Sequence, residues 1–323
     1  MNALQAIPMK YRDNTSGFAR GWYCVAESAD ISADTMLPVT YLGQQLIVYR
    51  DGSGTARVAD AYCPHLGAHL ASHDGCLTEG QIVCPFHKWR FDAASGKCTS
   101  IPYTNIIPPQ AKLTLYPVRE IAGMVLMWWH PEGVAPDFEP YDSSGVTESG
   151  SGWLRAGEYD RVSFAPFRDL FENLFDTAHV QQLHNSNVLP SIKKVTRIDY
   201  GLRVDYGTAL DSPTPVTSMT GHFSGLGLMT QIIEGDGFGM TQLATATPID
   251  LEQFQLHIRI YMRDTGSPEV NEMMREATVN RTIVEIGQDA AVLDFKKRLK
   301  QPLICAGDGP IMKYRAYADE FFA

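Results

Sequence analysis

Several features are missing or scarce in this sequence, and each absence disfavours a class of protein. No run approaches the roughly 18 uninterrupted apolar residues of a membrane-spanning helix, and the N-terminus has no apolar core flanked by basic residues. Basic runs are missing too, and a formal net charge of -10 argues against nucleic acid or an anionic membrane surface as the main partner. We therefore expect a cytoplasmic protein without a membrane span.

Cysteines are also few, six in 323 residues, which is too sparse for a disulfide scaffold. Four of the six lie between Cys63 and Cys98, so metal or redox chemistry explains their clustering better than disulfides do. Hydrophobic residues make up 44% of the chain and charged residues 20%, which is the composition of an ordinary globular protein. The length provides core material for one or two domains.

The chain from Gly21 to about His130 alternates short β-type runs with turn residues. These runs include Gly21–Val25, Gln45–Tyr49, Ile82–Pro85 and Gly123–Trp129. A proline-rich, acidic stretch from Pro131 to Pro140 follows and is typical of a linker. We predict an N-terminal all-β domain over residues 1–140, which includes an N-terminal extension.

Beyond the linker the pattern changes to mixed helix and strand. From Phe164 to His184 apolar residues recur at helical spacing. The apolar stripe consists of Phe167, Leu170, Phe171, Leu174 and Phe175. Strand-like segments then run from about Lys194 to Met262. A long helix should begin near Ser267-Pro268, where serine can cap and proline fits the first turn, and continue to about Leu299. The second domain, residues 141–323, is therefore predicted to be α+β.

Two short motifs in the first domain bring together thiols and imidazoles. They are Cys63-x-His65 and, after 18 further residues, Cys84-x-x-His87. Loops of this kind, each following a strand, can present one soft and one borderline ligand to the same centre. The four side chains could surround a single zinc ion, or the cysteines could bind one iron of a cluster and the histidines the other. Counting ligands does not separate these possibilities.

A second candidate centre involves His179 and His184. Residues five apart on a helix diverge by about 140°, so both can bind one metal only if the helix ends or distorts between them. Taken alone, they could equally be hydrogen-bonded helix residues that face different ways. A carboxylate would complete the facial triad of non-haem iron oxygenases. On the C-terminal helix Asp289 lies near the core-facing stripe and is the preferred ligand, Glu285 is its main competitor, and Asp294 should face water.

The residues around these motifs carry a family resemblance. The cysteine loops resemble those of Rieske [2Fe–2S] proteins at Pro64, Leu66-Gly67, Pro85 and Trp89. Ala68 and Phe86 stand where the Rieske proteins of respiratory chains usually have an additional pair of cysteines. Asn173-x-x-Asp176-x-x-His179-x-x-x-x-His184 resembles the iron-binding motif of Rieske non-haem iron oxygenases. The chain departs from the oxygenase pattern at Lys88, where glycine is common.

The resemblance implies an N-terminal Rieske domain followed by a helix-grip (START-like) catalytic domain with an antiparallel sheet. It assigns the [2Fe–2S] cluster to Cys63, His65, Cys84 and His87, and a mononuclear Fe(II) to His179, His184 and Asp289. Asp176 would bridge His179 to His87 of a neighbouring subunit in a head-to-tail homotrimer, and Asn173 would line the same cavity. His69, His73, Cys76 and Cys98 are expected to be structural. A separate flavin and iron–sulfur reductase, possibly with a ferredoxin, would supply the electrons.

Within the family, the segments CPFHKWRF and DGPIMKYRAYADEFF and the pair Gln288-Asp289 look most like the 3-ketosteroid 9α-hydroxylase oxygenases. This likeness implies a terminal oxygenase that hydroxylates a hydrophobic, steroid-like or polycyclic substrate with O2. An oxidative O- or N-demethylase and an aromatic-ring hydroxylating oxygenase would use the same metals and stay open as alternatives. A Rieske electron-transfer protein is the non-enzymatic alternative, and it would need neither the second domain nor Asp289.

Overall fold

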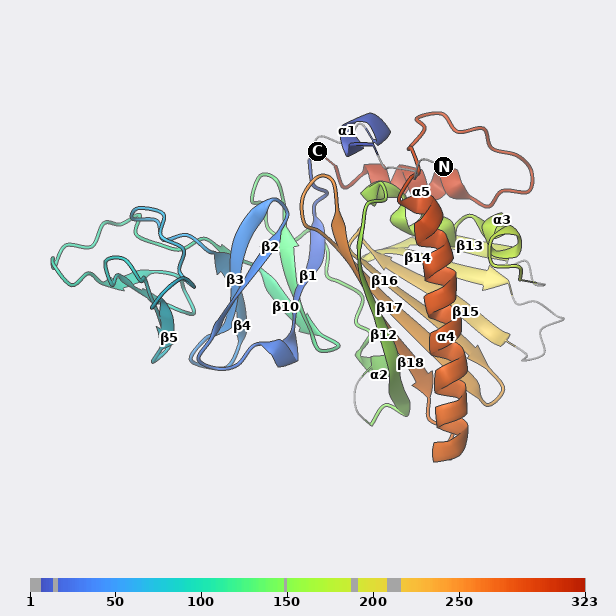
Figure 1. The fold of residues 1–323 in the computed structure, drawn as a ribbon, viewed down its shortest axis with the longest axis horizontal. Coiled ribbons are helices and arrows are strands. Elements are labelled where there is room, and N and C mark those ends of the chain that lie inside the picture. The colour runs from blue at the N-terminus through green and yellow to red at the C-terminus, as the bar shows by residue number, and fades with distance from the viewer. Residues whose placement is uncertain (1–6, 14–16, 148–149, 187–190, 208–215, 323) are drawn as a thin grey trace, which may run out of the picture. The chain divides into compact units, whose positions relative to one another are not determined.

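The computed structural model describes residues 7–13, 17–147, 150–186, 191–207 and 216–322. The chain forms two compact units (Figure 1). Trp22–Pro136 is the N-terminal unit, and Met1–Gly21 together with Asp137–Ala323 is the C-terminal unit. The predicted α+β fold is confirmed, with a β-rich first part and a large antiparallel sheet in the second. In the described residues no helix is long and apolar enough to cross a membrane.

The N-terminal unit consists of three small antiparallel sheets. The first contains β1 (Gly21–Glu27), β11 (Met124–Trp129) and β10 (Val118–Ile121) in that order. The second contains β2 (Met36–Tyr41), β3 (Gln44–Arg50), β4 (Ala56–Asp60) and β9 (Leu115–Tyr116). The third contains β5 (Cys76–Thr78), β6 (Gln81–Val83), β7 (Arg90–Asp92) and β8 (Cys98–Ser100). A short 3-10 helix, η1 (Ser28–Asp30), follows β1.

The two cysteine loops leave the ends of strands, as the sequence predicted. Cys63 follows β4 and Cys84 follows β6. Both cysteines belong to one buried cluster with Leu70, Trp89 and Phe91. The apolar strand residues thus build the rigid base from which both loops project.

The C-terminal unit is built on one seven-stranded antiparallel sheet. Its strand order is β12 (Trp153–Ser163), β18 (Phe254–Arg263), β17 (Phe238–Pro248), β16 (Leu228–Gly235), β15 (Val216–Ser224), β14 (Gly201–Gly207) and β13 (Ser191–Ile198). The long helix α4 (Pro268–Leu293) crosses one side of this sheet (Figure 1). It approaches β12 so closely that a Cβ at Gly157 would lie 2.7 Å from Val279 Cγ2. The unit also contains the short helices α1 (Met9–Arg12) and α2 (Ser144–Thr147) and the C-terminal helix α5 (Ile311–Asp319).

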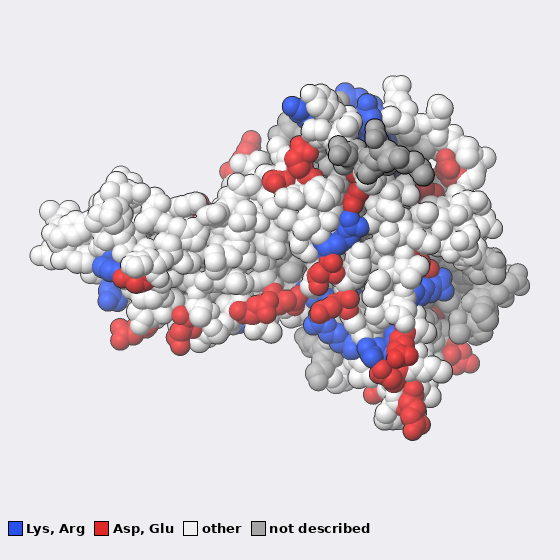
Figure 2. All heavy atoms as spheres, in the orientation of Figure 1, with Lys and Arg blue, Asp and Glu red and all other residues white. Residues whose placement is uncertain are grey.

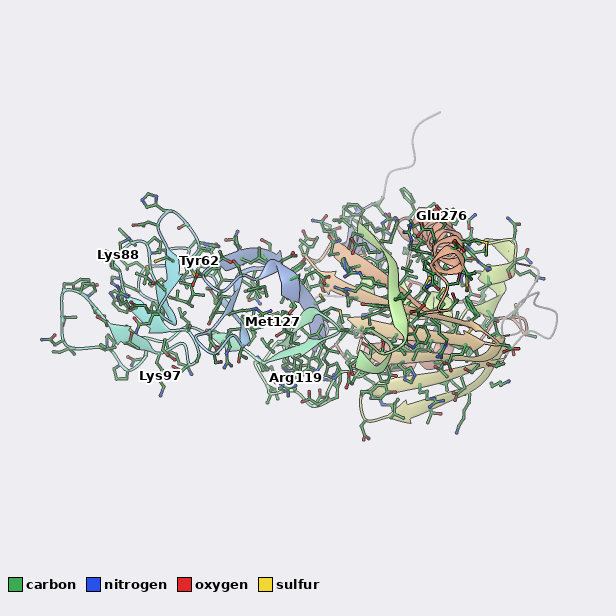
Figure 3. All side chains as sticks on the ribbon, turned by 90° about the horizontal axis from the view of Figure 1, so that it is seen from below. Tyr62, Lys88, Lys97, Arg119, Met127 and Glu276 are labelled. Atoms are coloured by element: carbon green, nitrogen blue, oxygen red, sulfur yellow. The ribbon has the colours of Figure 1, made fainter. Side chains whose placement is uncertain are left out.

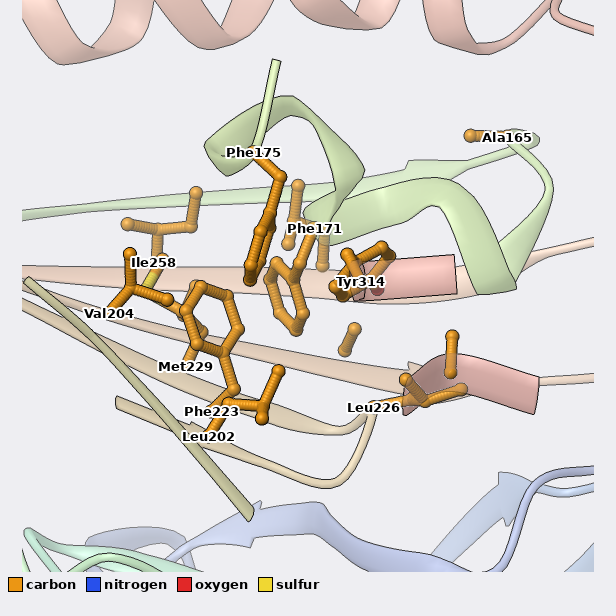
Figure 4. Close-up of a cluster of buried hydrophobic side chains, with 14 of the residues drawn as sticks. Ala165, Phe171, Phe175, Leu202, Val204, Phe223, Leu226, Met229, Ile258 and Tyr314 are labelled. Atoms are coloured by element: carbon orange, nitrogen blue, oxygen red, sulfur yellow. The ribbon is translucent and has the colours of Figure 1, made fainter. Parts of the chain in front are cut away.

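The core of this unit is aromatic and lies between the sheet and the segments that cover it. Phe171 and Phe175 pack against Phe223 of β15 and Tyr314 of α5 (Figure 4). Phe175 and Phe223 are fully buried. Burial of this size stabilises each large side chain by about 1.5–3 kcal/mol, so the core fixes the segment that leads directly to Asp176 and His179.

The segment Phe164–His184 is not one continuous helix, contrary to the prediction. It forms a 3-10 helix, η2 (Phe167–Leu174), and then a separate helix, α3 (Thr177–Gln182). Asp176, with φ -93° and ψ 90°, is extended and stands at the N-cap of α3. The Asp176 side chain makes no capping hydrogen bond, so the interruption consists of the extended backbone at this one residue. The apolar stripe was therefore correct while the continuity was not.

Helix α4 begins as predicted and ends earlier than predicted. Ser267 is the N-cap, accepting a hydrogen bond from Val270 N, and proline occupies the first position. The helix stops at Leu293 rather than near Leu299. Asp294 was predicted to face water, and this prediction was wrong. Its carboxylate accepts hydrogen bonds from Ser163 Oγ at 2.8 Å and Phe164 N at 3.0 Å.

The described residues before Gly21 pack with the C-terminal unit, whereas they were predicted to extend the first domain. Arg12 is buried and donates hydrogen bonds to the carbonyls of Phe164, Leu293 and Lys296. A guanidinium has five donors, which suits it to tie several chain ends together. The domain limits 1–140 and 141–323 stay a prediction.

A buried ion-pair network joins η2 to the chain that follows α4. Arg315 donates to both oxygens of Glu172, at 2.5 and 3.0 Å, and Lys296 Nζ lies 2.7 Å from the same carboxylate. Lys296 Nζ also lies 3.1 Å from Asp169, which is fully buried. Burial raises the pKa of Glu172, but the hydrogen bonds and charges of Arg315 and Lys296 outweigh it and hold the pKa below its usual value.

Replacing Arg315 with methionine is expected to lower the free energy of unfolding by about 3 kcal/mol, because a buried carboxylate loses its bidentate partner. Since the folded-state pKa of Glu172 is lowered, the network stabilises the fold above the ordinary carboxyl pKa and loses this effect as pH falls through the lowered one. Denaturant melts at neutral and acidic pH measure both effects. Arg275→Met, which removes the exposed pair with Glu272, is the control, with a change within about 0.5 kcal/mol. Equal effects of the two substitutions would contradict a special role for the buried network.

Charged residues are mixed on the face of the molecule shown in Figure 2, with basic and acidic side chains close together. This mixing agrees with the ion pairs found along β12 and α4, for example Arg155 with Glu158 and Arg281 with Glu285. On the face shown, the charges thus form pairs rather than a basic surface for a polyanion.

Candidate metal centres

The two cysteine loops have matching backbone geometry. Gly67 N donates to the carbonyl of Cys63 and Cys63 N to that of Ala68, both at 2.9 Å. In the second loop Lys88 N donates to the carbonyl of Cys84 at 3.1 Å and Cys84 N to that of Trp89 at 2.9 Å. Each loop is thus a tight turn closed by backbone hydrogen bonds, with its cysteine at the base.

The imidazoles of the two loops lie beside one another. The ring centroids of His65 and His87 are 4.7 Å apart with an interplanar angle of 70°. His65 stacks on Trp89 at 4.4 Å and 10°, and Trp89 Nε1 donates to Tyr103 Oη at 2.7 Å. The indole therefore fixes the orientation of the His65 ring.

The buried thiols test whether this donor set suits a metal group. Cys63 is 3% exposed and Cys84 is 1% exposed. Burial raises the pKa of the Cys63 thiol to about 12; the backbone of His65 opposes this rise and the neighbouring Cys84 adds to it. Two adjacent thiolates at this depth need a cation to balance them, which a metal supplies. The residues fit either a zinc ion or a [2Fe–2S] cluster with cysteines on one iron and histidines on the other.

Lys88 occupies a backbone conformation that favours glycine. Its φ is 57°, in the left-handed region that L-residues adopt at a cost of roughly 1 kcal/mol. This explains why a glycine is common here in the proteins that the loop resembles. The Lys88 side chain, labelled in Figure 3, pairs with Asp74. Both groups are about half exposed. A pair at this exposure contributes little stability but places a charge beside the second loop.

The nearby histidines and cysteines outside the two motifs have other contacts or are exposed. His69 Nδ1 accepts a hydrogen bond from Ala71 N at 3.2 Å, and Cys98 Sγ donates to the carbonyl of Ser100. Cys76 is exposed, as is His73. The structural roles expected for these four residues stay a prediction.

The second centre brings His179, His184 and Asp289 together. His184 Nε2 lies 3.3 Å and His179 Nε2 lies 3.8 Å from Asp289 Oδ1. One donor atom from each residue falls within 4.8 Å of the other two. The imidazole planes are nearly perpendicular, at 80°. Two imidazoles and one carboxylate that converge in this way match the protein ligands of a facial triad.

The end of helix α3 makes this convergence possible. The helix stops at Gln182, so His184 lies beyond its C-cap and escapes the 140° divergence of a regular helix. The other ring nitrogen of each histidine is occupied. His179 Nδ1 contacts the main-chain carbonyl of Asp176, and His184 Nδ1 lies 2.8 Å from Gln288 Oε1. With Nδ1–H donating in both rings, each Nε2 carries the lone pair and faces Asp289.

The Asp289 carboxylate provides the sharpest test of metal fit. Its Oδ1 is buried and makes no hydrogen bond within the described residues, although it points between two imidazole nitrogens. Burial raises the pKa of Asp289, while the two histidines and a hydrogen bond from the Asn173 side chain oppose the rise. An unpaired buried carboxylate oxygen is costly, and a divalent cation between the three side chains would satisfy it.

The structure distinguishes Asp289 from its competitor. Glu285 is half-buried and pairs with Arg281 at 2.8 Å, so its carboxylate already has a cationic partner, whereas Asp289 Oδ1 has none. In the family resemblance, Gln288 was used only as half of the pair Gln288-Asp289. Its contact with His184 was not predicted. The signal that could have found it is its place one residue before the carboxylate on the same helix.

Asp176 does not make the contact that was predicted for it. Its carboxylate was predicted to accept the His179 hydrogen bond, whereas the main-chain carbonyl is the group that contacts His179 Nδ1. In the described part of the chain no hydrogen bond to the half-buried Asp176 carboxylate is found. Asn173 lies beside the second centre, as expected, because its side chain forms a hydrogen bond with Asp289.

Comparison with known families gives two matches that follow one another along the chain. Residues 21–115 match the Rieske [2Fe-2S] domain. Residues 127–322, more than half of the chain, match the 3-ketosteroid 9alpha-hydroxylase C-terminal domain. The first match contains both cysteine loops, and the second contains all three residues of the second centre.

Individual relatives extend over nearly the whole chain. A cholesterol 7-desaturase of Caenorhabditis elegans is 27% identical over 337 residues, covering 94% of this chain and 77% of that protein. The oxygenase component of a 3-ketosteroid-9-alpha-monooxygenase of Rhodococcus rhodochrous is 27% identical, covering 94% of this chain and 83% of its own length. Among solved structures, NdmA of Pseudomonas putida CBB5 with caffeine has a TM-score of 0.72 at 18% identity and covers 93% of this chain and 89% of its own. Apo dicamba monooxygenase has a TM-score of 0.69 at 19% identity, with 95% and 98% covered. These structures show the same fold.

Proposed function

We propose a role for each side chain of the two centres from the premise that this chain belongs to the Rieske oxygenases with a 3-ketosteroid 9α-hydroxylase C-terminal domain. It is an oxidoreductase, the terminal oxygenase component of its system, and its cofactors are a Rieske [2Fe–2S] cluster and a mononuclear non-haem iron. Which residues hold these groups, and which substrate is oxidised, are the parts that we infer.

The cluster ligands are Cys63 and Cys84 on one iron and His65 and His87 on the other. Three observations support this assignment: the buried thiols, the adjacent imidazoles and the matching turns of the two loops. The imidazoles are the more accessible pair, since His65 and His87 lie among the exposed side chains of Leu66, Phe86 and Tyr103. Electrons would therefore leave through the histidine side.

The mononuclear iron is held by His179, His184 and Asp289. The observation that carries this assignment is the Asp289 Oδ1 atom, buried without a hydrogen bond and aimed between two Nε2 atoms. When bound, iron supplies the redox chemistry that activates O2. The chain's own contribution is orientation: the Asp176 carbonyl fixes the His179 ring, Gln288 fixes the His184 ring, and Asn173 holds the carboxylate.

The substrate that we propose is hydrophobic and steroid-like or polycyclic, and the reaction is hydroxylation. The face of the sheet that looks toward α4 is largely apolar, with Met219, Met229 and Met240 on neighbouring strands. Methionine side chains adapt to irregular apolar ligands. The likeness to a 3-ketosteroid monooxygenase along 94% of the chain agrees with a ligand of this kind.

Desaturation is the second candidate reaction, because a cholesterol 7-desaturase is equally similar over the same share of the chain. Oxidative demethylation rests on a shared fold only, at identities below 20%. A Rieske protein that only carries electrons would need neither the second centre nor the C-terminal family match.

Relatives described as oxygenase components imply a separate reductase as electron donor. We propose that this donor contains flavin and an iron–sulfur centre, with or without a ferredoxin, and that the chain assembles as a homotrimer. A cytoplasmic location is proposed on the same basis.

A product assay tests the proposed function. Purified protein with both metal sites filled is incubated with O2, a surrogate reductase and a panel of ketosteroids, sterols, methoxyarenes and polycyclic arenes. We expect hydroxylated steroid as the main product, and no product from the Asp289→Ala variant. Conversion of a methoxyarene with release of formaldehyde, and none of steroids, would replace the proposal by demethylation.

Asp176→Asn is expected to slow electron delivery to the iron site by about tenfold or more while both metals stay bound. The contact with His179 uses the main chain, so the asparagine keeps it, and only the half-buried carboxylate is lost. That carboxylate is proposed to receive a hydrogen bond from a neighbouring subunit's cluster histidine, the counterpart of His87. Single-turnover oxidation of the reduced cluster measures the rate. Oxidation as fast as in wild type with both metals present would refute the bridge.

A further inference from the structure

Two glutamines lie side by side on the seven-stranded sheet of the C-terminal unit. Gln231 of β16 is the direct Cα partner of Gln242 of β17. Gly221 of β15 continues this row on one side and Ile260 of β18 on the other. Among these four positions only the two glutamines carry polar side chains.

Both glutamines face α4. Alternation along a strand puts Gln231 on the same side as Met229, and Gln242 on the same side as Ala244, and both of these apolar residues belong to the aromatic core. A hydrogen bond between the sheet and α4 confirms that the Gln242 side chain points toward this helix: Gln242 Nε2 donates to Thr282 Oγ1 at 3.2 Å. Gln231 therefore points to the same interior.

Gln231 is the exceptional member of the pair. It is 6% exposed, and within the described residues no hydrogen bond of its amide is found, whereas Gln242 is satisfied by Thr282. Its same-face neighbours on β16 are the apolar Met229 and Ile233. The amide atoms are not among the fully buried side-chain atoms that lack a partner, so they keep some accessible surface although the residue as a whole is 6% exposed. An accessible amide that makes no hydrogen bond with the chain can bond a molecule that enters this apolar interior. The position of this amide between apolar side chains therefore suits it to contact a ligand rather than another part of the described chain.

Helix α4 sets the distance between the two glutamines and the metal site, because Thr282, which Gln242 contacts, and Asp289 both lie on it. Thr282 and Asp289 are seven residues apart on α4, which is close to two turns, so both project from the same face about 10 Å apart along the axis. Ile286 lies between them and packs on the core. On the other side of the row, Met219, Ile233 and Met240 are only half-buried, so this part of the face is partly open to solvent.

From this placement we propose that the Gln231 amide, beside the Thr282-anchored Gln242, binds an oxygen atom of the substrate at the end remote from the reacting carbon. The inference rests on the proposed function and names its ligand class: a rigid, apolar molecule with a carbonyl or hydroxyl group about two helical turns from the site of oxidation. The amide can donate to a carbonyl or accept from a hydroxyl, so it recognises either. A substrate held at both ends presents one carbon to the metal site, which fixes the position oxidised.

The test uses Gln231→Met, which nearly preserves size and removes the amide, in the full protein with both metal sites filled. Two probes are compared, a 3-ketosteroid with a single oxygen atom and the same steroid without that oxygen. For the ketosteroid we expect KM to rise about tenfold in the variant, the effect of one buried hydrogen bond. For the deoxy steroid KM should not change. Thermal stability should be equal or higher, because the amide makes no hydrogen bond with the described chain and methionine packs well among apolar neighbours.

Gln255→Met is the matched control. Gln255 lies on β18 of the same sheet but alternates onto the opposite face from Ile258, and its amide donates to the carbonyl of Leu256. It should leave KM for both steroids unchanged. Equal losses for the two steroids in Gln231→Met, with a lower melting temperature, would show that Gln231 is structural and overturn the inference. If wild type oxidises neither steroid while it converts another class on the panel, the proposed function fails instead, and the inference with it.

Discussion

Replacing Asp289 with alanine is expected to abolish oxygenation and to remove the mononuclear iron, while the cluster stays intact. The variant takes away the only carboxylate of the triad, and two imidazoles alone hold Fe(II) poorly. Metal analysis should fall from about three irons per chain to about two. The visible spectrum of the cluster should not change, because its proposed ligands all lie in the N-terminal unit.

Glu285→Ala is the matched control for this experiment. Glu285 lies one turn away on the same helix and its carboxylate pairs with the exposed Arg281 instead of the two imidazoles, so its loss should leave iron and activity near the wild-type values. Stability should change by no more than about 0.5 kcal/mol. Retention of iron in Asp289→Ala together with its loss in Glu285→Ala would move the third ligand to Glu285.

Replacing His87 with alanine is expected to abolish the Rieske electron paramagnetic resonance signal of the reduced protein. Imidazole ligation of one iron distinguishes this cluster from all-cysteine ones, and His65 alone cannot maintain it. Activity should disappear too, because electrons reach the second centre through the cluster. Iron at the His179, His184 and Asp289 site should be retained, which separates this variant from Asp289→Ala.

His69→Ala is the comparison for the cluster. His69 lies in the same region, yet its Nδ1 only accepts from the backbone of Ala71. The variant should keep the signal. Loss of the signal in His69→Ala and its persistence in His87→Ala would refute the ligand assignment, and a wild-type protein that holds zinc without sulfide would refute the cluster itself.

The residues that the sequence singled out as ligands do lie together in the structure, whereas their surroundings were predicted less well. Short motifs such as Cys84-x-x-His87 keep their ligands close in any fold that permits the turn, so their spacing is informative by itself. The five-residue spacing of His179 and His184 was also informative, because it required a helix end that the structure places at Gln182. The helix is also interrupted before His179, at Asp176. The apolar stripe alone did not predict this interruption.

Contacts that depend on tertiary geometry could not be predicted. A sequence does not show whether Asp176 uses its carboxylate or its carbonyl, because both lie within reach of a residue three positions on. The Asp294 carboxylate accepts hydrogen bonds from Ser163 and Phe164, at the end of β12, only because α4 ends beside that strand. The adjacency of Gln231 and Gln242 depends on the register of β16 and β17, which a one-residue shift would destroy.

Isotope labelling of the product tests the central claim most directly. The protein with both metal sites filled is supplied with a ketosteroid, electrons from a surrogate reductase and O2 enriched in the heavy isotope of oxygen, and the steroid product is analysed by mass spectrometry. If this chain is a steroid hydroxylase, the product gains one labelled oxygen atom from O2. A product that has lost two hydrogens and carries no label would identify a desaturase, and would contradict hydroxylation as the reaction of this site.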